Sequence, residues 1–144
     1  MLKGHSYSVT LHAGAMLLLG ALCARHLAGA EATLVADATV RMNPGQANFG
    51  GGQDLLVDGM NRSLLRFTLP TLAPGATLQQ ARLILYANRV QKAGTFQVQR
   101  ANGAWTESAV NSSSFPALGD VVAASVAVSA AAQFVVGDVT GVVQ

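Results

Sequence analysis

The fold is decided by residues 62–90, which read RSLLRFTLP–TLAPGATLQQ–ARLILYANRV. In the first and last of these runs, apolar residues recur at every second position. Because side chains alternate across a strand, this pattern predicts two strands, each with one buried and one exposed face. The connector contains Pro70, Pro74 and Gly75, which suit a loop. We therefore predict an antiparallel all-β domain. The predicted core positions are Leu65, Phe67, Leu69, Ala81, Leu83, Leu85 and Ala87.

Shorter β-prone runs occur on both sides of this pair, separated by turn residues. An Asp58-Gly59 dipeptide is a common hairpin signal. Pro44 and the run Gly50-Gly51-Gly52 predict a loop between the first two strands. Near the C-terminus, the alanines at 130–132 leave a helical turn open as an alternative. The further strands that we expect are Thr33–Arg41, Leu55–Val57, Thr95–Arg100, Ser125–Val128 and Gln133–Val136.

Residues 1–30 have the three-part build of a secretory signal peptide. Lys3 is basic, residues 11–24 are mostly apolar, and Ala28-Gly29-Ala30 places small residues before a cut at Glu31. The apolar run is shorter than the roughly 20 residues that a membrane span needs. We predict a helical signal peptide at 1–30 and a secreted, extracellular domain at 31–144, with no membrane attachment after cleavage. A cut after Ala32 and a lipid anchor at Cys23 are the alternatives.

Removal of the leader changes the composition of the chain. Seven of the 9 Lys and Arg residues and all 7 Asp and Glu residues lie from residue 31 onward, so the processed chain is formally neutral. We therefore expect no nucleic-acid partner. All three His residues and the single Cys lie before residue 31. This distribution excludes Ser-His-Asp and Cys-His catalysis, His/Cys zinc sites and disulfides from residues 31–144.

Eight short landmarks follow one another along residues 31–144. They are Ala36-Asp37 with Val40, Asn48-Phe49-Gly50, Leu55-Leu56-Val57, Arg62 to Phe67, Ala81 to Tyr86, Val98-Gln99-Arg100, Trp105-Thr106-Glu107 and Asp138-Val139-Thr140. In this order and at this spacing they resemble the DNRLRE domain, which is grouped with carbohydrate-binding module family 96.

The resemblance implies a secreted, non-catalytic carbohydrate-binding module with a jelly-roll-like β-sandwich fold. Acidic polysaccharides such as alginate are the ligand class that it implies. The chain departs from the family at two places. Val110-Asn111-Ser112 stands where a Trp is usual, and the sequence stops after Asp138-Val139-Thr140, where relatives continue into a closing strand. We therefore expect a truncated sandwich that lacks its last strand, with a catalytic domain downstream in a full-length gene.

Sugar binding needs an exposed aromatic ring and convergent polar groups, and Arg suits the carboxylates of uronic acids. The strand faces opposite the predicted core carry such residues. We predict that they form one ligand-binding platform. Its members are Arg66, Arg82, Tyr86, Asn88, Gln97 and Gln99. Trp105 is expected in the core, and Phe49 is the alternative exposed ring.

The sequence predicts no cofactor, and a structural calcium ion is the one exception left open. Asp37, Asp54, Asp58 and Asp138 could supply oxygen ligands, but turn formation and capping explain Asp58 and Asp138 as well. We expect no enzyme activity. The alternatives are a structural or adhesive surface module without a sugar ligand, and an accessory piece of a polysaccharide lyase or glycosidase.

Overall fold

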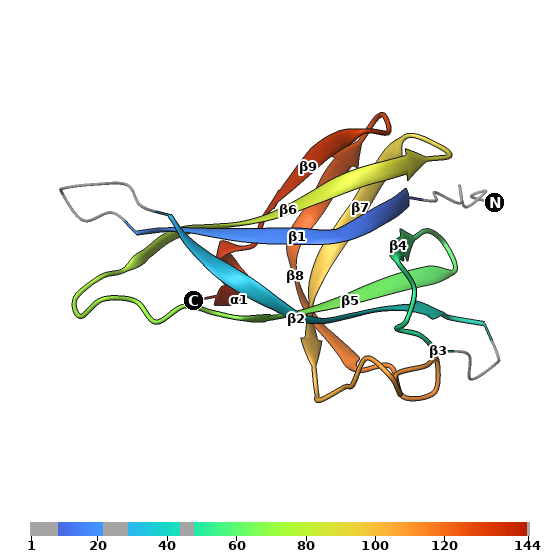
Figure 1. The fold of residues 1–144 in the computed structure, drawn as a ribbon, viewed down its shortest axis with the longest axis horizontal. Helices are drawn as coiled ribbons and strands as arrows, with labels where there is room; N and C mark the ends of the chain where they lie inside the picture. Colours follow the sequence, from blue (N-terminus) through green and yellow to red (C-terminus); the bar gives the residue numbers. More distant parts are fainter. Residues whose placement is uncertain (1–8, 22–28, 44–47, 144) are drawn as a thin grey trace.

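β-Structure dominates the chain, as the alternating runs predict (Figure 1). The computed structural model describes residues 9–21, 29–43 and 48–143. The strands are β1 (Val9–Ala21), β2 (Ala30–Arg41), β3 (Asn48–Phe49), β4 (Asp54–Val57), β5 (Asn61–Thr68), β6 (Leu78–Val90), β7 (Gly94–Asn102), β8 (Ala117–Val128) and β9 (Gln133–Asp138). One short helix, α1 (Thr140–Val143), follows β9.

The strands form two antiparallel sheets. The larger sheet has the order β3-β2-β1-β6-β9, with β4 joined to β1 and β5 joined to β2. Strands β7 and β8 form a separate two-stranded sheet. In Figure 1, β7 and β8 run steeply across the long strands β1 and β6. The two sheets share one apolar core, so the prediction of an antiparallel all-β sandwich is confirmed.

The main core lies against the inner face of β6. Ala81, Leu83, Leu85 and Ala87 are all buried, as the alternation predicts. They pack with buried valines of β8 and β9, and Leu65 and Phe67 of β5 are partly buried against the same cluster. Leu69 was predicted to join them, but it is 44% exposed because β5 ends at Thr68.

A second core cluster covers the other side of β5, and we call it the Trp105 cluster. Its buried members are Ala36, Ala38, Val40, Leu64, Trp105 and Val110. Leu64 is out of phase with the predicted core positions Leu65 and Phe67, so alternation predicts it to be exposed. It is buried because the loop 103–116, which we call the Trp105 loop, covers that face. Strand β2 carries a register shift between Leu34 and Ala36 where it pairs with β5. The apolar residues of Thr33–Arg41 do not alternate strictly in the sequence, and this irregularity explains why.

The structure differs from expectation at the N-terminus. Val9–Ala21 is strand β1 rather than part of a helix. Its backbone pairs with β6 on one side and with β2 and β4 on the other, which satisfies main-chain groups of the extended segment. Residues 1–8 and 22–28 lie outside the described residues. The assignment of residues 1–30 as a leader, and the absence of a closing strand, stay predictions.

The other predicted strands are present, and each is longer than expected, β8 most of all. Strand β8 begins at Ala117, well before the predicted start at Ser125. The alanines before β9 form a bend rather than a helical turn, with Ala132 at a φ of 57°. Within residues 9–21, 29–43 and 48–143, no helix is long and apolar enough to cross a bilayer.

Truncation of the main core should destabilise the domain. Leu85 is only 3% exposed, so we expect Leu85→Ala to lower the free energy of unfolding by about 2–5 kcal/mol. Leu69→Ala makes the same chemical change at a 44% exposed position, and we expect it to cost less than about 0.5 kcal/mol. Urea denaturation of both variants measures the difference. Equal losses would contradict this placement of the core.

Candidate functional site

The outer face of β6 and β9 carries exposed aromatic and charged side chains. Cross-strand pairing places Arg82 opposite Asp138, Ile84 opposite Val136 and Tyr86 opposite Phe134. Because the odd-numbered residues of β6 face the core, these even-numbered residues face outward. We call this surface the β6–β9 outer face. Its members are Arg82, Ile84, Tyr86, Phe134, Val136 and Asp138.

Two aromatic rings define one end of this face. The Tyr86 and Phe134 rings meet edge to face, with centroids 5.2 Å apart and planes inclined at 65°. Phe134 is 67% exposed, although a Phe ring would ordinarily be buried. Phe134 is thus held by its neighbour and still open to a ligand. Sequence reasoning missed Phe134, because its outward direction follows only from the register between β9 and β6.

The other end of the face carries opposite charges. Arg82 is exposed, and its Nε donates a hydrogen bond to Oε1 of Gln80 at 2.9 Å. Hydrogen bonds from Thr140 lower the pKa of Asp138, with smaller contributions from Gln80 and Arg82. Asp138 is therefore ionised near neutral pH. Asn88 is exposed and continues the outward positions of β6 beyond Tyr86.

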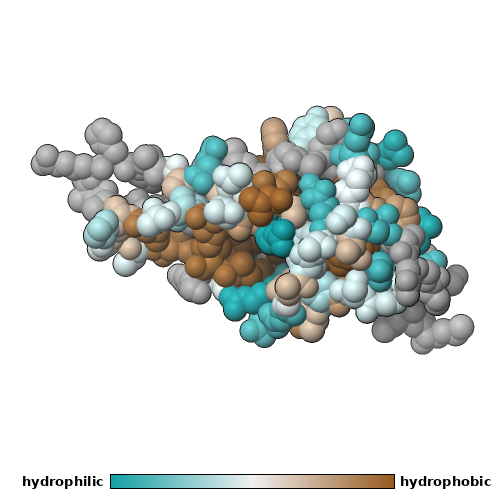
Figure 2. Space-filling view, turned by 60° about the horizontal axis from the view of Figure 1, so that its bottom comes forward, coloured by the Kyte–Doolittle hydropathy of each residue, from teal (hydrophilic) through white to brown (hydrophobic). Residues whose placement is uncertain are grey.

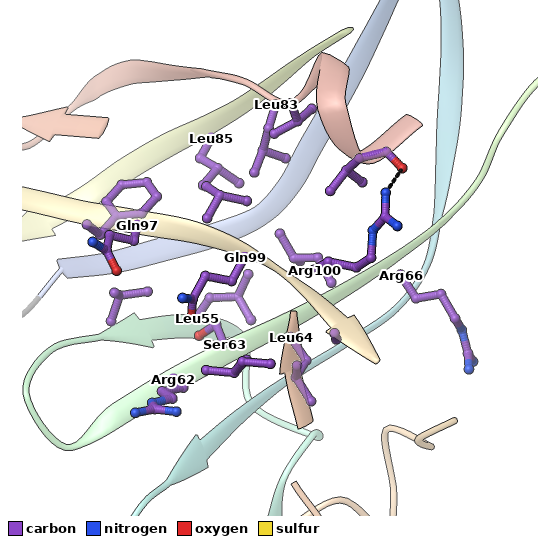
Figure 3. Close-up of a pocket in the computed structure, with 18 of the residues that line it drawn as sticks. Leu55, Arg62, Ser63, Leu64, Arg66, Leu83, Leu85, Gln97, Gln99 and Arg100 are labelled. Carbon is purple, nitrogen blue, oxygen red and sulfur yellow. Dashed lines mark hydrogen bonds between the residues drawn. The ribbon is translucent and has the colours of Figure 1, made fainter. Parts of the chain in front are cut away.

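The structure does not bring the six predicted platform residues together. Arg82, Tyr86 and Asn88 lie on β6, but Arg66 lies on β5 and Gln97 and Gln99 lie on β7. Strands β5, β6 and β7 are not neighbours in any sheet. Arg66, Gln97 and Gln99 instead line a cleft of about 680 Å³ between β5 and β7 (Figure 3). We call it the β5–β7 cleft. Sugar binding by these three residues stays a prediction.

The β5–β7 cleft has an apolar floor. Leu83 and Leu85 of β6 project toward it, and Gln97 and Gln99 project from β7 (Figure 3). Figure 2 shows a brown apolar hollow on this side of the molecule, bordered by teal hydrophilic side chains. Arg100 lies at one end, where its Nη2 donates to the carbonyl oxygens of Gly141 and Val142 at 3.2 and 3.3 Å.

Trp105 is a core residue rather than a sugar-stacking ring. It is 8% exposed, as expected. The Arg66 guanidinium lies 5.2 Å from the Trp105 ring centroid, and its Nη1 donates to the Trp105 carbonyl oxygen at 2.9 Å. Arg66 is therefore partly engaged in holding the Trp105 loop. Phe49, the alternative ring, is 41% exposed beneath the Arg41 guanidinium, 5.8 Å away.

The Asn48-Phe49-Gly50 and Trp105-Thr106-Glu107 segments dock on one another. Asn48 Nδ2 donates to the carbonyl oxygens of Glu107 and Val110 at 2.8 and 2.6 Å. Oε2 of Glu107 accepts a hydrogen bond from the backbone N–H of Asp37 at 3.2 Å. Two of the landmarks that suggested the family thus form one structural contact. Glu107 therefore has a docking role here.

Burial of Asp37 and, secondly, the nearby Glu107 carboxylate raise the pKa of Asp37. Because the pKa of Asp37 is higher in the folded state than in the unfolded state, protonation of Asp37 stabilises the fold. This stabilisation is complete below the unfolded-state pKa of Asp37 and is lost as the pH rises through its folded-state pKa.

The four aspartates considered for calcium do not form one site. Within the described part of the chain, no group of three or more His, Cys, Asp or Glu side chains could hold a metal ion. Asp58 Oδ1 accepts from the backbone N–H groups of Met60 and Asn61, both at 2.7 Å. Asp138 Oδ1 accepts from N and Oγ1 of Thr140 at 2.9 and 2.6 Å. Turn formation therefore explains these two residues.

The chain is thus a two-sheet β-sandwich with aromatic and guanidinium groups on one outer face, an arrangement that suits a binding module. Comparison with protein families identifies its family. The model of carbohydrate-binding module family 96 matches residues 28–144. The chain therefore belongs to carbohydrate-binding module family 96 and contains a carbohydrate-binding module. No curated protein and no solved structure gives a significant match. Lack of enzyme activity in the whole protein stays a prediction.

Two loops approach each other so closely at Gly50 that a larger residue does not fit there. A Cβ at Gly50 would overlap the backbone carbonyl of Glu107, whereas a Cβ at Gly51 meets nothing within 4 Å. We expect Gly50→Ala to lower the melting temperature by several degrees, because the Trp105 loop must move away. Gly51→Ala is the matched control and should leave it unchanged. Thermal unfolding monitored by Trp105 fluorescence tests this, and an unchanged Gly50→Ala variant would refute the docking.

Proposed function

We propose that this module binds an acidic polysaccharide such as alginate through the β6–β9 outer face. The observation that carries the proposal is the exposed Phe134 ring, held by Tyr86 on the same face as Arg82. An aromatic ring stacks on the apolar face of a sugar, and a guanidinium bonds a carboxylate in a two-pronged geometry. Uronic acids offer both features.

The spacing of these groups suits an extended polymer. Tyr86 and Arg82 are four residues apart on one strand, which corresponds to about 13 Å along the sheet. A chain lying along β6 would therefore meet the rings at one point and the guanidinium at another. Since residues 31–144 carry equal numbers of acidic and basic residues, attraction to an acidic polymer has to be local.

Two truncations test this binding face. We expect Arg82→Ala to weaken retention on an alginate gel about tenfold or more, because a hydrogen bond to a charged group contributes ~1.5–3 kcal/mol. Phe134→Ala should weaken it by a similar factor through loss of stacking. Affinity electrophoresis with alginate in the gel measures both effects, with circular dichroism to confirm folding. Retention that stays unchanged in both variants would exclude this face.

Two control variants complete the experiment. Arg66→Ala changes the β5–β7 cleft instead, and we expect it to retain alginate binding. If Arg66→Ala alone loses alginate binding, the sugar site lies in the cleft instead. Asp138→Asn removes a carboxylate opposite Arg82 but keeps an acceptor for Thr140. It should increase retention on alginate and leave retention on a neutral polysaccharide unchanged. A gain on both polymers would contradict recognition of acidic groups.

The proposal includes export. The basic, apolar and small-residue regions of residues 1–30 support a cleaved signal peptide and an extracellular site of action. Such a module could be attached to a polysaccharide lyase or glycosidase in a longer protein. N-terminal sequencing of the exported protein should give a start at Glu31. A mature form that begins with Met1 would contradict the leader.

A structural or adhesive surface module without a sugar ligand is the second candidate. The exposure of Phe134 and Val136, 67% and 53%, favours it, because a contiguous exposed apolar patch also suits contact with another protein. A polysaccharide panel separates the two functions. Absence of binding to every acidic and neutral polymer would favour the adhesive role.

A further inference from the structure

The β5–β7 cleft lies between two strands that each have only one strand partner. Among the described residues, β5 pairs with β2 and β7 pairs with β8. Each strand therefore has one side without a neighbouring strand in the described sheets. A strand edge of this kind presents backbone N–H and C=O groups that can bind a further strand.

The lining of the cleft shows that these edges face it. Residues 61–67 of β5 and residues 94–101 of β7 contribute to the lining without interruption. Side chains on one face of a strand would contribute only every second residue. Unbroken runs from both strands indicate that the backbone itself borders the cleft (Figure 3). An extended chain placed here would have hydrogen-bonding groups along both sides.

The side chains of the cleft favour a particular type of strand. The floor is apolar and includes Leu83 and Leu85. The charged residues of the lining are three arginines and one aspartate, namely Arg62, Arg66, Arg100 and Asp58. Among the described residues, the guanidiniums contact aromatic rings and backbone carbonyls rather than carboxylates. A segment with apolar residues on one face and acidic residues on the other would match both surfaces.

The larger sheet shows that this fold accepts an added strand. Strand β1 lies outside residues 28–144, which the family model matches. It nevertheless lies between β6 and β2, with ten paired positions along β6. In the unprocessed chain, the family-matched part thus already binds one extended segment from outside it, through backbone pairing.

We propose that the β5–β7 cleft is a strand-acceptor site for an extended peptide of alternating apolar and acidic residues. The bound peptide pairs with β5 on one side and with β7 on the other, and joins the β2–β5 and β7–β8 pairs into one sheet. Its apolar face packs on partly buried side chains of the cleft such as Leu65 and Phe96. Its acidic face meets Arg62 and Arg66. The site is separate from the β6–β9 outer face, so it does not depend on the sugar proposal.

A synthetic peptide tests the site on the full 144-residue chain. The probe is a peptide about eight residues long, the length of an ordinary strand, in which valine alternates with glutamate. We expect saturable binding that changes the fluorescence of Trp105, the single tryptophan, which lines the cleft. Hydrogen exchange should slow in residues 61–68 and 94–102 and stay unchanged in β9.

Matched controls distinguish the contribution of backbone pairing to peptide binding from that of charge. The same peptide with N-methylated amides should not bind, because it cannot donate to the strand edges. The double variant Arg62→Glu/Arg66→Glu should bind the peptide at least about tenfold more weakly. Its affinity for a valine–lysine peptide should rise, which shows that the variant is folded. Absence of peptide binding, equal binding of the N-methylated peptide, or protection confined to other strands would overturn the proposal. Displacement of the peptide by alginate would also overturn it and assign the cleft to sugar.

Discussion

The alternating burial along β6 is the constraint on which the rest of the structure depends. Ala81, Leu83, Leu85 and Ala87 face the core, so Arg82, Ile84 and Tyr86 have to face outward. A shift of register by one residue would bury a guanidinium and expose two leucines. β6 also lies between β1 and β9, so backbone pairing holds this register from both sides. The stability of the core and the direction of the candidate sugar-binding side chains therefore have one cause.

Most of the residues that hold the loops of the sandwich together differ from those that we propose for ligand recognition. Trp105, Asn48, Gly50 and Glu107 dock one loop on another, and they include the most distinctive landmarks of the sequence. Their contacts are structural. The exposed residues that suit a ligand, such as Phe134, lie outside those landmarks. Membership of family 96 thus indicates a carbohydrate-binding module. The face that we propose for sugar recognition combines Arg82 and Tyr86, which lie in a landmark, with Phe134, which lies outside the landmarks.

Period-two patterns in the sequence predicted the strands and the main core, because every second side chain of a strand faces the core and is therefore apolar. They placed Arg82, Tyr86 and Asn88 on the outer face for the same reason. The patterns could not say which strands are neighbours, so Arg66, Gln97 and Gln99 were assigned to the same platform although they line the cleft. Leu64 was assigned to an exposed face because Trp105, which covers it, lies far away in sequence. The register between β6 and β9, which places Phe134 beside Tyr86, could not be predicted from the sequence either.

The position of β1 has a consequence for the order of events in biogenesis. A leader has to be threaded through a translocation channel as an unfolded chain, yet Val9–Ala21 pairs with β6 along most of its length. If residues 1–30 are the leader that we propose, folding of the precursor before export would sequester part of the segment that targets it. Its removal by a peptidase would then change β6 from an interior strand to an edge strand of the sheet. Newly exported molecules would then have β6 as an unpaired edge strand, and their solubility would depend on how soon another segment pairs with it.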